Sequence, residues 1–258
     1  MSGEVLVERR GGVVIITINR PKARNAVDRA TAHGIAAAID DFESDPAITV
    51  AILTGAGGTF CSGMDLKAFV NARPGDRPAE LEGRGFAGIT ETPPIKPLIA
   101  AVEGYALAGG CELALACDMI VAAENAVFGL PEVTRGLVAG SGGLVRLPRR
   151  VPQQIAMEYA LTGAQMLAGD AHRWGLVNRL TPNGGSLDEA LRLAREITAN
   201  APLAVRATKR VITESADWSL AEAWSRQRGI VDSVLTSSDA HEGSQAFAEK
   251  RPAVWTGR

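Results

Sequence analysis

The chain has 258 residues, of which 46% are hydrophobic and 22% are charged, and its formal net charge is −2. This composition is typical of a folded globular protein and argues against disorder, while the length allows one large α/β domain. The small negative charge, without a long run of Lys or Arg, argues against nucleic acid or an anionic membrane as a partner.

The N-terminal stretch "MSGEVLVERRGG" lacks the apolar segment of a secretory signal. No uncharged apolar stretch reaches the roughly 20 residues that a membrane helix needs. Three cysteines, Cys61, Cys111 and Cys117, form neither a CxxC pair nor an even set. We therefore expect a soluble, cytoplasmic protein whose cysteines are reduced and buried.

The first half of the sequence alternates between predicted strands and helices. "VVIITI" (residues 13–18) is a β-branched run that "NRP" ends, and apolar residues at helical spacing then predict a helix that stops at Asp45. "ITVAIL" (48–53) predicts a second strand, "LIAAVEGYAL" (98–107) a third, and "MIVAAENAVFG" (119–129) two short ones. Continuous apolar strands separated by helices predict a parallel sheet that is covered on both faces.

Beyond about residue 140 the pattern becomes helical. Apolar residues recur every three or four positions in segments that begin at Leu144, Gln153, Leu187, Leu203 and Leu220. No strand is expected after "LVNRL" (176–180), so the last sixty or so residues are predicted to be all-helical. No linker or repeat separates the two halves, which favours one α/β domain with a helical C-terminal extension.

Several common catalytic motifs are missing from the sequence. No GxGxxG follows a strand, and "TGAGGTF" lacks the GK[ST] of a P-loop. His33, His172 and His241 are isolated, so no metal site is expected. "AGSGG" around Ser141 approaches the GxSxG motif of hydrolases, but the preceding "GLV" makes a poor strand. A glycine-rich turn that enters a helix is the simpler interpretation of this segment.

Two glutamates lie in apolar surroundings: Glu112 in "GYALAGGCELALACD" (104–118) and Glu132 in "FGLPEVTRG". Each alone could simply favour a helix start, where acids interact with the helix dipole. Together they indicate more, because an unpaired buried carboxylate is costly. Two carboxylates that converge on a pocket can position a water and transfer a proton. The glycines of "AGG" leave backbone N–H groups free at a helix start, which suits a developing oxyanion.

These motifs, in this order, resemble the enoyl-CoA hydratase/isomerase (crotonase) superfamily, and most of all a bacterial enoyl-CoA hydratase. "FCSGMDL" (60–66), the Glu112 segment and "FGLPEVTRGLVAGSGG" carry the resemblance, which extends from "INRPKARNAV" to "EGSQAFAEKR". It implies an α/β fold, a crotonase-like spiral of ββα units that ends in an all-helical trimerisation region. Residues 1–196 would form the core with the acyl-CoA site, and 197–258 would serve oligomerisation and cover CoA. A homotrimer or a dimer of trimers is therefore expected.

The resemblance also implies roles for single residues. Main-chain N–H groups of Met64 and Gly109 would form an oxyanion hole for the thioester oxygen. Glu112 and Glu132 would be the catalytic pair that holds a water for addition across the C2–C3 double bond. The N–H of Gly140 would help to seat that water.

Five further residues match positions where the family binds CoA: Lys22, Ser62, Lys67, Phe247 and Lys250. Phe247 and Lys250 correspond to tail positions that reach the CoA of an adjacent subunit. For each lysine, a solvated surface charge is the alternative interpretation. No metal and no separate cofactor is implied, because CoA is part of the substrate.

The implied activity is that of an enoyl-CoA hydratase, a carbon–oxygen lyase that converts trans-2-enoyl-CoA into 3-hydroxyacyl-CoA. Glu112 would deprotonate the water that attacks C3, and Glu132 would manage the proton at C2. Two acids around one water should titrate together, with one pKa raised. The stretch between Phe69 and Pro94 departs most from the family pattern and is expected to shape the acyl pocket.

Other functions remain open at this point. An enoyl-CoA isomerase would need only the Glu132 position, and a dehydratase of a hydroxyacyl- or carnitinyl-CoA would use both acids in reverse. A non-catalytic acyl-CoA-binding relative and an RNA-binding relative are also possible. The intact acid pair argues against the first of these two, and the net charge of −2 argues against the second.

Overall fold

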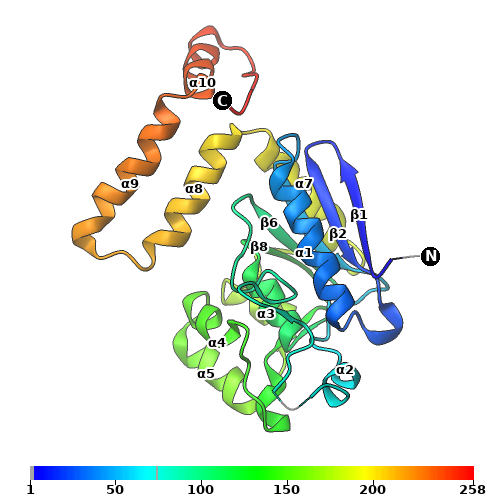
Figure 1. Cartoon of the computed structure of the whole chain (residues 1–258). Helices are drawn as coiled ribbons and strands as arrows, with labels where there is room; N and C mark the ends of the chain where they lie inside the picture. The colour runs from blue at the N-terminus through cyan, green and yellow to red at the C-terminus, as the bar shows by residue number, and fades with distance from the viewer. Residues whose placement is uncertain (1–2, 74) are drawn as a thin grey trace.

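The computed structural model describes residues 3–73 and 75–258 as an α/β body from which three C-terminal helices extend (Figure 1). The central sheet has six strands in the order β1-β2-β3-β6-β8-β11. These strands are β1 (Val5–Arg10), β2 (Val13–Ile18), β3 (Val50–Gly55), β6 (Leu98–Val102), β8 (Met119–Ala123) and β11 (Arg179–Thr181). From β2 to β11 all neighbours run parallel, whereas β1 pairs antiparallel with β2.

The predicted parallel sheet is thus present, but with an antiparallel edge strand that the sequence analysis missed. β1 reads "VLVERR", and five of its six residues are exposed, so it lacks the apolar run that marks β2, β3, β6 and β8. Gly11 has φ +62 between β1 and β2. A glycine at such a position allows the tight reversal of a hairpin.

The expected single strand at 98–107 is wrong, because the chain changes sheets inside it. β6 belongs to the central sheet, and β7 (Tyr105–Leu107) pairs with β9 (Val127–Gly129) in a second sheet that β10 (Met166–Leu167) completes. Gly104 lies at the change with φ +53, and a Cβ placed on it would lie 2.5 Å from the carbonyl oxygen of Gly58. Only glycine fits this conformation and this close approach.

Two helices cover the two faces of the central sheet. Val14 and Ile16 of β2 belong to the core cluster that includes the apolar face of α1 (Arg29–Ser44). Val13 and Ile15 face the other way and pack with residues of α7 (Ser186–Thr198). Strands that are buried on both faces read as unbroken apolar runs, which is why β2 was recognisable from the sequence.

The remaining elements are shorter. A two-stranded hairpin contains β4 (Glu80–Leu81) and β5 (Gly85–Phe86). The other helices are α2 (Leu66–Val70), α3 (Gly109–Ala116), α4 (Gly143–Arg146), α5 (Gln153–Thr162), α6 (Ala168–Arg173), α8 (Pro202–Ser215), α9 (Leu220–Leu235) and α10 (Ser238–Glu249), with 3-10 turns η1 (Pro21–Ala23), η2 (Pro131–Arg135) and η3 (Leu147–Arg149). β11 overlaps the end of "LVNRL", and every later element is a helix, as predicted.

The C-terminal helices α8 and α9 form a hairpin that projects from the body, and α10 follows α9 at the open end of this hairpin, opposite the α8–α9 turn (Figure 1). Lys209 fastens α8 to the body, since its Nζ lies 2.6 Å from the Pro94 carbonyl oxygen and 2.7 Å from Asp118 Oδ2. Much of the apolar surface of this region is uncovered. The exposed apolar side chains here are Ile212, Leu220, Trp224, Val231, Leu235 and Phe247.

This uncovered surface is the kind that an oligomer would cover, but the predicted trimer or dimer of trimers stays a prediction. The predicted boundary between residues 196 and 197 falls in the last turn of α7 and also stays a prediction.

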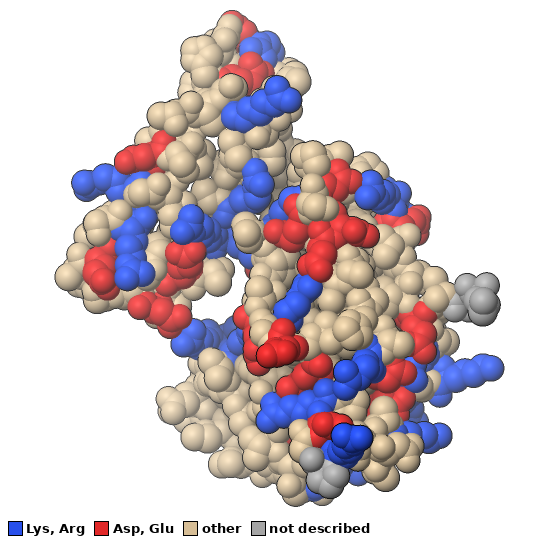
Figure 2. Space-filling model, in the orientation of Figure 1, with Lys and Arg blue, Asp and Glu red and all other residues tan. Residues whose placement is uncertain are grey.

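Within residues 3–73 and 75–258, no helix combines the length and hydropathy that crossing a membrane requires. On the face in Figure 2, basic and acidic residues are interspersed. The surface over α4 and α5 is formed largely by uncharged residues, among them the exposed Leu144, Val145, Met157 and Leu161. The expected cytoplasmic location and the expected lack of a nucleic-acid partner remain predictions.

Candidate active site

Glu112 lies in the first turn of α3, a helix whose eight residues are all buried. Its side chain does more than begin a helix, because Oε1 accepts hydrogen bonds from the N–H groups of Ser141 at 2.7 Å and Gly143 at 3.0 Å. Burial raises the pKa of Glu112 above its ordinary value, although these two N–H groups act in the opposite direction. The carboxylate is therefore fixed between α3 and the turn that precedes α4.

Glu132 is the second residue of η2, directly after Pro131. Its Oε2 is buried and has no hydrogen-bond partner among the described residues. Burial raises the pKa of Glu132 to about 7, and the negative charge of Glu112 contributes to this shift. An effect of one carboxylate on the pKa of another is expected when the two acids lie near each other.

The start of α3 lies against the segment that carries Met64. A Cβ placed on Gly63 would lie 3.1 Å from the backbone nitrogen of Gly109 and 3.0 Å from Cβ of Ala108. Ala108 is the N-cap of α3 and has φ +51 and ψ −127, a conformation that is strained for any residue but glycine. In the described part of the chain, the N–H groups of Met64 and Gly109 donate no hydrogen bond. Two free main-chain donors therefore lie on adjacent segments.

Close packing leaves no room for a side chain at either of the two glycines that begin α3. A Cβ on Gly110 would lie 2.0 Å from the carbonyl oxygen of Cys61. A Cβ on Gly109 would lie 2.6 Å from the ring of Phe86, which comes from β5. Phe86 belongs to the stretch that was expected to shape the acyl pocket, but no motif in the sequence distinguishes it from its neighbours.

Gly140 lies exposed in the turn before α4, and its N–H donates no hydrogen bond to a described residue. Its neighbours Ser141 and Gly143 supply the two N–H groups that hold Glu112, a role that the sequence analysis missed. The hydroxyl of Ser141 forms no hydrogen bond with a histidine in residues 3–73 and 75–258, which leaves the hydrolase interpretation without support.

The predicted CoA residues fall into two groups. The first group comes from neighbouring segments: Lys22 on η1, Ser62 before α2, and Lys67 on α2. The N–H of Ser62 donates a hydrogen bond to the carbonyl oxygen of Arg24, just after η1, at 3.1 Å. Both lysines are exposed. Phe247 and Lys250, also exposed, lie on α10 and at its end, far from α2 (Figure 1). Contact of this second group with the CoA of an adjacent subunit stays a prediction.

The cysteines are free and buried, and burial raises the pKa of each thiol to about 12. Within residues 3–73 and 75–258, no three His, Cys, Asp or Glu side chains are grouped as ligands of a metal ion would be. The predicted lack of a metal and of a separate cofactor remains a prediction.

Arg146 is a further residue near Glu112 that the sequence analysis missed. It comes from α4, and its Nη2 donates a hydrogen bond to the carbonyl oxygen of Thr90 at 2.5 Å. Its positive charge acts to lower the pKa of Glu112. Arg146 thus joins the turn that holds Glu112 to the stretch that was expected to shape the acyl pocket. The sequence could not reveal this contact, because its partner is a backbone oxygen 56 residues away.

Known proteins are similar to this chain in sequence and in fold. The model of the family "Enoyl-CoA hydratase/isomerase" matches residues 8–258. A carnitinyl-CoA dehydratase of Salmonella enteritidis PT4 is 46% identical over 265 residues, which cover 100% of both chains. The crystal structure of an enoyl-CoA hydratase from Mycobacterium tuberculosis H37Rv has 59% identity and a TM-score of 0.96, with 100% of both chains covered.

A carnitinyl-CoA hydratase from Mycobacterium avium, also known from a crystal structure, is 47% identical with a TM-score of 0.78, again with 100% of both chains covered. The family match and these full-length similarities agree with the order of motifs and with the α/β fold. The chain belongs to the enoyl-CoA hydratase/isomerase (crotonase) family.

Proposed function

We propose that this protein hydrates trans-2-enoyl-CoA thioesters to 3-hydroxyacyl-CoA. One observation carries the proposal: Glu112 is held by two N–H groups, and its negative charge helps to raise the pKa of Glu132, whose buried Oε2 has no hydrogen-bond partner among the described residues. Membership of the family supports an acyl-CoA thioester as the substrate class. The free N–H groups of Met64 and Gly109 support an oxyanion hole beside the two acids.

In the proposed mechanism the thioester oxygen accepts hydrogen bonds from Met64 and Gly109. The carbonyl is polarised and C3 becomes electrophilic, and loss of one such donor costs about 10²- to 10³-fold in kcat in comparable sites. Ionised Glu112 accepts a proton from the water as its oxygen attacks C3. Glu132, with a pKa of about 7, gives a proton to C2. The net change is addition of OH to C3 and H to C2.

The second candidate is the reverse reaction, dehydration of a 3-hydroxyacyl-CoA. It is favoured by the 46% identity to a carnitinyl-CoA dehydratase. In this direction ionised Glu132 would remove the C2 proton, and protonated Glu112 would give a proton to the leaving hydroxyl. An isomerase would need no second acid, so the two N–H groups that hold Glu112 argue against it.

The test compares substrates on the wild-type protein. Loss of the conjugated ultraviolet band on addition of crotonyl-CoA or a longer trans-2-enoyl-CoA supports hydration. Appearance of that band with carnitinyl-CoA, at a kcat/KM far above that for every unsubstituted enoyl-CoA, would favour the dehydratase instead. No turnover in either direction would contradict both and leave an acyl-CoA-binding protein. Repeating the assay after dialysis against a chelator tests the prediction that no metal is required.

A further inference from the structure

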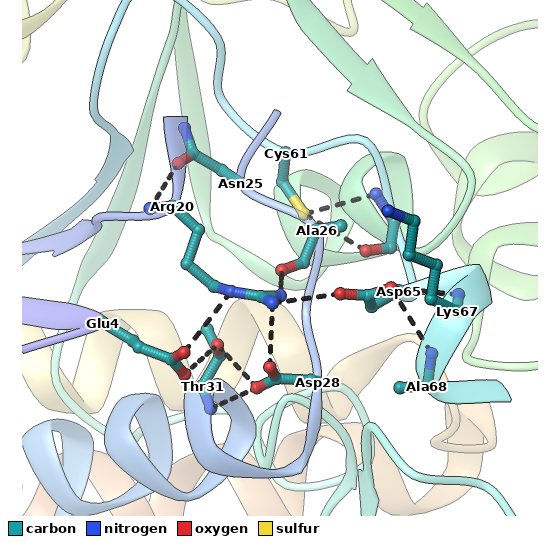
Figure 3. Close-up of polar contacts among 11 residues, drawn as sticks. Glu4, Arg20, Asn25, Ala26, Asp28, Thr31, Cys61, Asp65, Lys67 and Ala68 are labelled. Carbon is teal, nitrogen blue, oxygen red and sulfur yellow. Dashed lines mark hydrogen bonds and ion pairs between the residues drawn. The ribbon is translucent and has the colours of Figure 1, made fainter. Parts of the chain in front are cut away.

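Arg20 lies just after β2, and its guanidinium is surrounded by acidic side chains (Figure 3). Nη2 lies 2.9 Å from Asp28 Oδ2 and 3.0 Å from Asp65 Oδ2. Nε lies 3.5 Å from Glu4 Oε1, and Nη1 donates to the carbonyl oxygen of Ala26. The Arg20 side chain is only 17% exposed. Water therefore screens its ion pairs less than it screens pairs on the open surface.

Asp65 connects Arg20 to the start of α2. Its Oδ2 pairs with Arg20, while its Oδ1 accepts hydrogen bonds from the N–H groups of Lys67 at 3.0 Å and Ala68 at 3.4 Å. The same carboxylate is therefore both the partner of Arg20 and the N-cap of α2. α2 carries Lys67, one of the predicted CoA contacts.

The peptide group that joins Gly63 to Met64 is fixed by the same region. The N–H of Val27 donates to the Gly63 carbonyl oxygen at 2.8 Å, and the N–H of Asp65 donates to the Val27 carbonyl oxygen at 2.9 Å. The Gly63 carbonyl and the Met64 N–H belong to one planar trans peptide and point in opposite directions. Holding that carbonyl on Val27 therefore sets the direction of the free Met64 N–H.

The segment that carries Val27 is itself held rigidly. The N–H of Arg20 donates to Asn25 Oδ1 at 2.9 Å, and Asn25 Nδ2 donates to the carbonyl oxygens of Ala56 at 2.9 Å and Thr59 at 2.5 Å. Asn25 is fully buried. Arg20 then bonds to Asp28 and Ala26, on either side of Val27. It thus connects both segments that define the position of the Met64 peptide.

We propose that Arg20 is a positioning residue of the oxyanion hole, which orients the Met64 N–H through Asp65 on one side and the Val27 segment on the other. This inference rests on the proposed function, since it assumes that the Met64 N–H binds the thioester oxygen. Arg20 acts through other groups and touches no reacting atom. Its loss should therefore affect the transition state more than substrate binding, because negative charge develops on the oxygen only there.

The main variants are Arg20→Lys and Asp65→Asn. Lysine keeps the charge but lacks the planar fork that bonds several partners at once. Each variant should lower kcat about 10- to 100-fold, less than removal of an oxyanion donor, while KM changes less than about threefold. The double variant should lose little more than either single one, because the two residues act as a unit.

A second readout requires no turnover. Acetoacetyl-CoA forms an enolate that absorbs in the near ultraviolet, and an oxyanion hole favours this enolate in the bound state. At fixed pH, Arg20→Lys and Asp65→Asn should each lower the enolate fraction of the bound ligand relative to wild type. A residue that only stabilises the fold would not change this spectrum in a folded, saturated protein.

Arg179→Lys is the matched control. Arg179 also joins two elements, β11 and α7, through Glu189 at 2.9 Å and Glu196 at 2.6 Å, and it is 31% exposed. It lies on the edge strand β11, outside the contacts of the Met64 peptide. This control should lose thermal stability while kcat and the enolate fraction stay at the wild-type level.

The outcomes separate the inference from the proposed function. Wild-type kcat and enolate fraction in folded Arg20→Lys and Asp65→Asn would overturn the inference, as would equal losses in Arg179→Lys. A wild-type protein that forms the bound enolate but hydrates no enoyl-CoA would refute the proposed function, and the enolate spectra of the variants would still decide the role of Arg20. If the wild-type protein stabilises no enolate, Met64 forms no oxyanion hole and the inference is refuted as well.

Discussion

The helices α3 and α9 differ sharply in how many of their residues are buried within the single chain. All eight residues of α3 are buried, whereas Ile230 is the one buried residue among the sixteen of α9. Gly110 in α3 leaves no room for a Cβ, but a Cβ on Gly229 in α9 would meet nothing within 4 Å. Glu112 is thus buried by residues of its own chain. The C-terminal hairpin instead presents an apolar surface that the predicted oligomer would cover.

The first prediction concerns the buried side of this comparison. Glu112→Gln should reduce the hydration rate about 10²- to 10⁴-fold, because the amide cannot take a proton from water. The fold should persist, since the amide oxygen can still accept from Ser141 and Gly143. Steady-state assays with an enoyl-CoA and thermal unfolding of the same sample measure the two effects. Near wild-type hydration would contradict the role of Glu112.

The second prediction concerns the uncovered side. Leu220, Trp224, Val231 and Leu235 are exposed along α9, with spacings that place them on one stripe. Trp224→Asp should weaken subunit association by about 2 to 4 kcal/mol, as loss of a central aromatic does at other interfaces. Sedimentation over a range of concentrations measures this change. Arg226→Ala, which removes a surface pair with Glu222, is the control, and a monomeric wild-type protein would refute the oligomer.

The third prediction tests the two glycines against each other. Gly110→Ala should lower the free energy of unfolding by about 1 to 3 kcal/mol, because its Cβ would overlap the Cys61 carbonyl oxygen. Gly229→Ala should raise it by about 1 kcal/mol, since alanine favours a helix interior and finds open space. Urea unfolding measures both. A loss of stability in Gly229→Ala would indicate that another subunit packs closely on α9.

The fourth prediction concerns pH and Glu132, whose pKa is raised from 4.5 to about 7. In hydration Glu132 must give a proton, so kcat/KM should fall about tenfold per unit as pH rises above about 7, and Glu132→Gln should lack this limb. Dehydration should show the opposite dependence. A pH profile in each direction tests the assignment, and an unchanged limb in Glu132→Gln would refute it.

The same shift also predicts how stability depends on pH. Between pH 4.5 and about 7 the folded state retains a proton on Glu132 that the unfolded chain has lost. The free energy of unfolding should therefore decrease as pH rises through this window. Glu132→Gln should show a weaker decrease, which urea unfolding at several pH values can measure.

Local patterns were sufficient to predict much of the fold. β2 and β3 are buried on both faces and read as apolar runs, and α1 shows apolar residues at helical spacing. Patterns failed where a distant contact decides the path of the chain. β6 and β7 belong to different sheets, and Gly104 between them leaves no room for a Cβ beside the Gly58 carbonyl oxygen. No local signal reveals that approach.

The candidate site divides in the same way. Glu112 and Glu132 were predicted because acids in apolar segments are unusual and because their motifs resemble a family. The groups that hold these segments in place were not predictable. Ser141 contacts Glu112 across 29 residues of sequence, and Asp65 contacts Arg20 across 45. Such pairs are ordinary polar residues until the fold brings them together.

Ala108 limits which sequences can serve at the mouth of α3. Its left-handed backbone disfavours every residue that carries a side chain, at a cost of about 1 to 3 kcal/mol, and its Cβ already lies close to Gly63. Glycine is the replacement that would relieve the strain, whereas a larger residue would face both the backbone penalty and Gly63. Libraries built to broaden substrate range should therefore leave position 108 small and place their diversity in the stretch around Phe86.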